Sequence, residues 1–325
     1  MIIGRMPKFS LRFDMRGPAF GPSHQALYAA ALDMTEYADR HGFAQVDLSE
    51  HHGVEDGYLP SPIVFAAAIA ARTKRMRLSF KAIVAPLHDP VRLAEDIAIL
   101  DVVSGGRVET TLVAGYVPYE FALFGKELKD RPAAMEETIR VMKAAWTGEP
   151  FDYRRASFRV TPRPVQRPHP PLLMGGSSPA AARRAGRIAD GFVTYRDDLY
   201  QIYLDAAKAC GRNPEPFSLP SPGFLYVAED PDKAWAEIAP HALHEMNSYG
   251  QWIAETGSDG RFAVVESIEQ LKATGAYLVV TPDECVDLAR KFETVALHPL
   301  MGGLPPEIGW RGLSLFVEKV MPRLA

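Results

Sequence analysis

The chain has 325 residues, of which 47% are hydrophobic and 23% charged, and its formal net charge is −4. This mildly acidic balance, without a basic stripe, gives no support for a nucleic-acid-binding protein. Residues 1–10 lack the apolar core of a signal peptide, and no run approaches the roughly 18 apolar residues of a membrane span. We therefore expect a cytoplasmic protein without a membrane partner.

Strand-like and helix-like segments alternate along the chain. Predicted strands cover residues 9–15, 46–49, 77–84, 107–113, 172–174, 191–194, 217–227 and 294–299, and residues 277–280 form a short apolar stretch. Predicted helices cover residues 23–41, 63–72, 90–100, 131–146, 179–186, 198–210, 231–249, 282–292 and 312–324. Ser23 is the expected N-cap of the first helix, and residues 151–160 indicate a small hairpin.

This alternation predicts a parallel sheet, and eight strand–helix units over this length favour a closed barrel. An open doubly wound sheet would carry a glycine-rich fingerprint after its first strand, and residues 15–19 do not supply one. We predict one α/β domain over residues 1–325, a (β/α)8 TIM-like barrel with insertions after the fourth and seventh strands. The glycine-containing stretch 249–264 is expected to act as a lid.

A carboxylate and two imidazoles follow the second predicted strand directly, at Glu50, His51 and His52. Titratable groups at the carboxyl end of a parallel strand lie where α/β folds place their chemistry. The alternative is a loop that these polar residues merely cap. Their position favours chemistry, because a histidine can exchange protons near neutral pH.

Glycines and serines at 175–178 join a short predicted strand to a helix that begins near Pro179. Glycine lets a phosphate approach the backbone, and serine hydroxyls with helix N-terminal amides supply donors. A tight turn with a capping serine is the alternative. The second half of a barrel is where such folds often bind phosphate, which favours the phosphate site.

Metal binding finds little support in the sequence. The two cysteines, Cys210 and Cys285, lie far apart and form no cysteine-based site. His241, His244 and Glu245 share a helical face by spacing, but a partly exposed polar face explains them as well. We predict no metal.

An ordered set of short motifs extends over nearly the whole chain. It comprises residues 48–52 (LSEHH), 83–90 (IVAPLHDP), 94–96 (AED), 100–107 (LDVVSGGR), 119–121 (YEF), 124–125 (FG), 130–131 (DR), 175–177 (GGS) and 189–191 (ADG). Together these motifs resemble the bacterial luciferase-like flavin oxidoreductase family. The resemblance implies a TIM-like barrel with a flavin, or its deazaflavin analogue, at the C-terminal mouth.

The resemblance also implies roles for single residues. His51 matches the active-site histidine of the family, and the peptide between Lys81 and Ala82 matches a non-prolyl cis bond beneath the flavin ring. Gly176, Ser177 and Arg131 match phosphate-binding positions. The predicted cofactor-binding set is Lys81, Ala82, Arg131, Gly175, Gly176, Ser177 and Ser178.

We therefore predict a monooxygenase that uses reduced FMN and oxygen on a small apolar organic substrate. A homodimer and a separate flavin reductase are the expected partners. One alternative is a hydride-transfer enzyme that uses coenzyme F420 on the same fold; another is a non-catalytic flavin-binding protein. Val113 and Ala114 stand where the luciferases have a reactive cysteine and a phosphate-binding arginine, so light emission is not expected.

Overall fold

The computed structural model describes residues 7–215, 217, 222–257 and 262–324, and it divides into two compact units. Unit 1 comprises Met1–Asp47, Val54–Pro60 and Ser218–Ala325; unit 2 comprises Leu48–Gly53 and Ser61–Phe217. Among the described residues, none of the helices has the length and apolar character needed to cross a membrane. The assignment of one domain to the whole chain stays a prediction.

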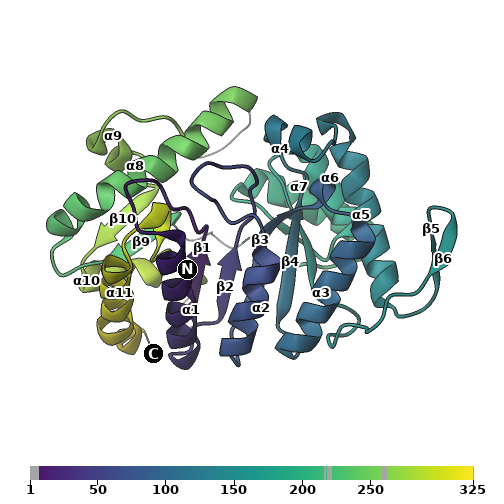
Figure 1. Cartoon of the computed structure of the whole chain (residues 1–325), viewed down its shortest axis with the longest axis horizontal. Helices are drawn as coiled ribbons and strands as arrows, with labels where there is room; N and C mark the ends of the chain where they lie inside the picture. Colours follow the sequence, from purple (N-terminus) through teal and green to yellow (C-terminus); the bar gives the residue numbers. More distant parts are fainter. Residues whose placement is uncertain (1–6, 216, 218–221, 258–261, 325) are drawn as a thin grey trace. The chain divides into compact units, whose positions relative to one another are not determined.

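Unit 2 is built on four parallel strands in the order β3 (Arg77–Val84), β4 (Val108–Val113), β7 (Leu172–Gly175) and β8 (Gly191–Val193). Each strand is followed by a helix: α3 (Pro90–Ser104), α5 (Arg131–Trp146), α6 (Pro179–Ile188) and α7 (Asp197–Ala209). A further helix, α2 (Pro62–Arg72), precedes β3 and lies beside α3 (Figure 1). Leu112 on β4 pairs with Met174 on β7, so the carboxyl ends of these strands lie side by side.

Two additions interrupt this pattern in unit 2. The segment after β4 contains a helix that the sequence analysis took as loop, α4 (Pro118–Leu123), and a 3-10 turn, η2 (Leu128–Asp130). Phe121 holds α4 in place because its ring packs against Val84 and Leu87. An antiparallel hairpin, β5 (Phe151–Tyr153) with β6 (Ala156–Phe158), follows α5 as predicted and projects from the unit (Figure 1).

Unit 1 places β1 (Lys8–Phe13) between β11 (Thr294–Leu297) and β2 (Gln45–Leu48). Ser23 caps α1 (His24–Arg40) as predicted, by accepting from the Ala26 N–H. A separate parallel pair, β9 (Phe224–Val227) with β10 (Tyr277–Val280), packs its aromatic rings under the long helix α8 (Pro231–Thr256). The remaining helices of unit 1 are α9 (Ile268–Ala273), α10 (Pro282–Ala289) and α11 (Pro306–Leu315).

The parallel α/β class is confirmed, whereas the closed barrel and the positions of its insertions stay predictions. β9 and β10 pair with each other rather than continuing the sheet of β1, which the sequence pattern did not indicate. The expected lid at 249–264 is helical through Thr256, because α8 runs seven residues past its predicted end at Tyr249. Residues 258–261 of that stretch lie outside the described residues.

A fully buried arginine lies at the carboxyl end of β1 in unit 1. Arg16 donates to Asp56, and its Nε lies 3.8 Å from Oδ2 of Asp14. Its guanidinium also lies 4.7–5.2 Å from three ring centroids, those of Tyr58, Tyr249 and Trp252. Burial alone would lower the pKa of Arg16, but these neighbouring oxygens outweigh it and raise that pKa.

The interpretation as a partly exposed polar face holds for His244, whose side chain is 26% exposed, but was wrong for His241 and Glu245, which are buried. His241 is 6% exposed and lies 2.9 Å from the Gly302 carbonyl through Nδ1. Glu245 is 2% exposed and accepts from the Tyr277 hydroxyl at 2.7 Å. Both residues are covered because the chain returns to them through β10 and the turn after β11, contacts that no local pattern reveals.

Candidate functional site

His51 lies in unit 2, in the segment that leaves β2, and its side chain is largely buried. Its Nδ1 lies 2.9 Å from Oε1 of Glu120. The same oxygen accepts the backbone N–H of His52 at 2.8 Å. Because an ionised carboxylate only accepts, this contact places a proton on Nδ1.

Glu120 is a site residue to which the sequence analysis gave no role. It lies on α4, is 1% exposed and follows Tyr119, whose hydroxyl donates to the His52 carbonyl at 2.8 Å. Its position in the YEF motif was the only sequence signal, since 69 positions separate it from His51. Glu120 holds the imidazole in one orientation and one tautomer, as a carboxylate does in a catalytic triad.

Glu50 forms a second carboxylate–imidazole cluster beside this pair. Its Oε2 accepts the Val84 N–H at 2.5 Å, and its Oε1 lies 2.7 Å from His88 Nε2 and 3.3 Å from His52 Nε2. Burial alone would raise the pKa of Glu50, but these hydrogen bonds outweigh it and hold the pKa at about 2. In turn, Glu50 outweighs the effect of burial on His88 and raises the pKa of that imidazole.

Strand β3 carries the non-prolyl cis peptide between Lys81 and Ala82 that the resemblance implied. The Ser49 hydroxyl donates to the Lys81 carbonyl at 2.8 Å, which ties this peptide to the segment that bears His51. The predicted cis bond is therefore confirmed, and Lys81 is hydrogen-bonded to a residue two positions before His51.

Arg131 begins α5, and its Nη1 donates to the Gly115 carbonyl at 3.1 Å in the loop after β4. Gly175 ends the neighbouring strand β7, where a Cβ would come within 2.8 Å of the Val113 side chain. The absence of a side chain at Gly175 therefore lets the ends of β7 and β4 pack closely together. The structure places Arg131 at the start of α5, the helix that follows β4, and Ser177 in the loop after the neighbouring strand β7.

The loop from β7 to α6 presents donors at a helix N-terminus. The Ser178 side chain caps the helix by accepting from the Ala181 N–H, so the capping interpretation is right for this serine. Within the part of the chain that the structure describes, no group accepts the N–H of Ser177 or of Ser178. Amides at a helix N-terminus and an arginine are donors of the kinds that bind a phosphate.

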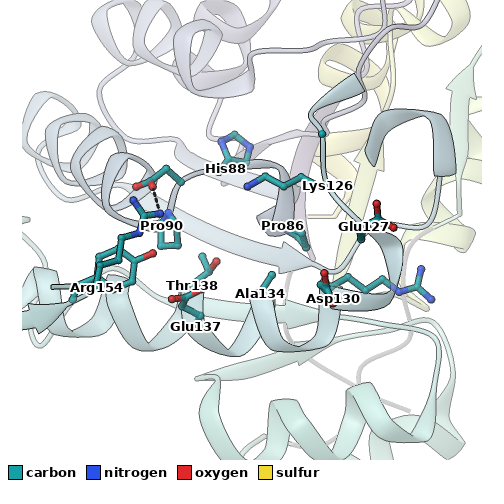
Figure 2. Close-up of a pocket in the computed structure, with 14 residues that line it drawn as sticks. Pro86, His88, Pro90, Lys126, Glu127, Asp130, Ala134, Glu137, Thr138 and Arg154 are labelled. Carbon is teal, nitrogen blue, oxygen red and sulfur yellow. Dashed lines mark hydrogen bonds and ion pairs between the residues drawn. The ribbon is translucent and has the colours of Figure 1, made fainter. Parts of the chain in front are cut away.

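Arg131 also lines a cavity of about 280 Å³ between α5, the segment after β3 and the hairpin (Figure 2). His88 lies at its wall and brings the Glu50 cluster to this surface. Besides Arg131, the charged residues in its lining are Asp89, Lys126, Glu127, Asp130, Glu137 and Arg154.

A family model described as luciferase-like monooxygenase matches residues 13–298 of the chain. The F420-dependent glucose-6-phosphate dehydrogenase of Nakamurella multipartita is 29% identical over 97% of this chain and 96% of that enzyme. The FMNH2-dependent dimethylsulfone monooxygenase of Pseudomonas putida is 30% identical over 69% of this chain and 66% of that enzyme. The solved structure of monooxygenase RslO1 from Streptomyces bottropensis has a TM-score of 0.78 and 29% identity, covering 98% and 100% of the two chains.

Proposed function

Because this chain belongs to the luciferase-like monooxygenase family, as its motifs indicated, we propose that it is an FMN-dependent monooxygenase of a small organic substrate. Membership of this family identifies the protein as an oxidoreductase. The choice of FMN as cofactor and of a small organic substrate is our proposal. The observation that carries it is the His51–Glu120 pair, a buried imidazole whose orientation a carboxylate fixes at 2.9 Å. Similarity to an FMNH2-dependent monooxygenase supports the choice of FMN.

The residues present fit the phosphate end of FMN. The amides of Ser177 and Ser178 with the Arg131 guanidinium would hold its charge, and the α6 N-terminus adds a favourable dipole. When bound, reduced FMN supplies the electrons that activate oxygen. His51 then holds or gives up a proton at Nε2, while Glu120 keeps the ring from turning.

Two partners follow from this proposal. An enzyme that consumes reduced FMN needs a supply of it, which a separate flavin reductase would provide. We also propose a homodimer, because α2 is apolar around its whole circumference yet exposes Val64, Ala67 and Ala68 to solvent. A helix without a polar face is normally covered.

Arg131→Ala is expected to weaken binding of FMN by about 10- to 100-fold and binding of riboflavin hardly at all, the range for a lost hydrogen bond to a charged group. Only FMN carries the phosphate that the guanidinium would pair. Fluorescence titration of both flavins measures this. Arg92→Ala removes an exposed arginine that pairs with Asp96 and should change neither affinity. Equal losses for FMN and riboflavin would place Arg131 away from the phosphate.

The second candidate is an F420-dependent hydride-transfer enzyme. It is favoured by the F420-dependent dehydrogenase that aligns with 97% of this chain. The two functions differ in their use of oxygen. We expect oxygen uptake that depends on both reduced FMN and an organic substrate, measured with a panel of apolar compounds. Oxidation of reduced F420 that proceeds without oxygen would establish the second candidate instead.

A further inference from the structure

Glu50, His52 and His88 bring three possible metal-ligating atoms together in unit 2. One donor atom from each lies within 4.8 Å of the others. Glu50 Oε1 lies at the centre of the set, 3.3 Å from His52 Nε2 and 2.7 Å from His88 Nε2. Neighbouring ligands of a tetrahedral zinc ion, at bonds of about 2.0–2.1 Å, lie about 3.4 Å apart. The distance to His52 is close to this value, and the distance to His88 is that of a hydrogen bond, which would lengthen when an ion displaces the shared proton.

The surroundings hold two of these side chains in position. The backbone of His52 is fixed on both sides, at its N–H by Glu120 and at its carbonyl by Tyr119. Its ring packs edge-on against Phe124, with centroids 4.7 Å apart. The second oxygen of Glu50 accepts the Val84 N–H at 2.5 Å. Such outer contacts orient metal ligands in known sites.

The hydrogen bonding of the His52 Nε2 atom is incomplete. The atom is buried, and although it lies 3.3 Å from Glu50 Oε1 it makes no well-aligned hydrogen bond among the described residues. Leaving a buried polar atom without a partner costs about 1–3 kcal/mol. An ion between the three side chains would take up the lone pair of this nitrogen together with those of Glu50 Oε1 and His88 Nε2.

We propose that Glu50 Oε1, His52 Nε2 and His88 Nε2 bind a first-row transition-metal dication, with Zn²⁺ as the best-fitting ion. Two imidazoles and one carboxylate are a ligand set that zinc sites use, and three protein ligands leave a fourth position for water. The site is independent of the flavin function proposed above, and ion binding there does not require FMN.

The cavity at Arg131 gives an ion a route to the cluster. The His88 side chain is 26% exposed and forms part of the cavity wall. In Figure 2 the Lys126 side chain extends toward the His88 ring, where its positive charge opposes a dication. The negative charge of Asp96 acts oppositely to Lys126: it raises the pKa of His88 and so favours a positive charge there. The lysine is exposed and long, so it can turn away when an ion enters.

The test uses the full-length protein as purified, treated with a chelator and titrated with Zn²⁺ by calorimetry and with Co²⁺ by absorption. We expect one ion per chain, and for Co²⁺ the intense visible bands of a four- or five-coordinate site. His88→Ala and His52→Ala should each weaken binding by about 100-fold or more, since even outer contacts are worth 10- to 100-fold. Lys126→Ala should strengthen it, because it removes the opposing charge.

His41→Ala is the matched control, because it removes an exposed histidine at the end of α1. It should leave the affinity unchanged. An adventitious ion only, shown by an equal loss in His41→Ala, would overturn the site. So would absence of stoichiometric Zn²⁺ binding, or six-coordinate Co²⁺ bands in the wild-type protein, and neither of these results depends on whether a variant folds.

Discussion

Replacing His51 with alanine is expected to lower turnover by about 100-fold or more, the range of general acid–base catalysis, while FMN affinity stays nearly constant. The imidazole is held by Glu120 at 2.9 Å, and no other imidazole shares that contact among the described residues. The flavin phosphate is assigned to a different loop, so binding and turnover should separate. Oxygen uptake with reduced FMN and an accepted substrate measures the first, and flavin titration the second.

Glu120 variants make this prediction more specific. Glu120→Gln keeps a carbonyl oxygen that can accept from both His51 and the His52 N–H, so it should lose less activity than Glu120→Ala. A structural role for His51 would leave its alanine variant fully active. Equal losses in the two Glu120 variants would show that negative charge, not orientation, is what Glu120 provides.

The largest stability effect is expected at Arg16. Arg16→Ala should lower the free energy of unfolding by about 3–5 kcal/mol, the range for removing one partner of a buried ion pair. The side chain is fully buried, and its loss removes the guanidinium that pairs with Asp56 and lies 3.8 Å from Asp14. Among the described residues, Asp56 then keeps His244 as an ion-pair partner and Asp14 keeps His298. Arg16→Lys should recover part of the loss, since an ammonium keeps the charge but not the planar contacts with the rings. Urea denaturation followed by tryptophan fluorescence gives the values.

Arg311 is the matched control in the same unit. It pairs with Glu237 at 2.6 Å, but both side chains are exposed, at 56% and 39%. Arg311→Ala should therefore cost less than about 1 kcal/mol. Comparable small losses for both arginines would mean that the Arg16 cluster is already solvated or relaxes without cost.

Local chemistry made much of the fold predictable. Buried apolar runs marked the strands, and Ser23 and Ser178 marked helix starts because their side chains satisfy amides within three residues. The order of the elements then indicated the parallel α/β class. Pairing of β9 with β10 was not predictable in this way, because it depends on which strands meet across some 50 residues of intervening chain.

The residues that complete the site could not be predicted from local sequence patterns. His51 was predictable from its place after a strand, but its partner Glu120 comes from a segment that looked like loop. The cluster at Arg16 draws on residues 40 and more positions away, and each of them alone indicates only a polar surface. Burial of charged groups follows from long-range packing, which is where local patterns carry the least information.

The placement of Glu120 on α4 bears on how this enzyme can be redesigned. The residue that orients His51 is carried by a six-residue helix anchored by Phe121, outside the strands that form the scaffold. Exchange of residues 114–130 with those of a relative would leave the parallel sheet intact while replacing the acid and its anchor together. A grafted segment that brings both a carboxylate and an aromatic anchor should therefore keep the enzyme active. A segment that lacks the carboxylate should abolish activity while the sheet still folds.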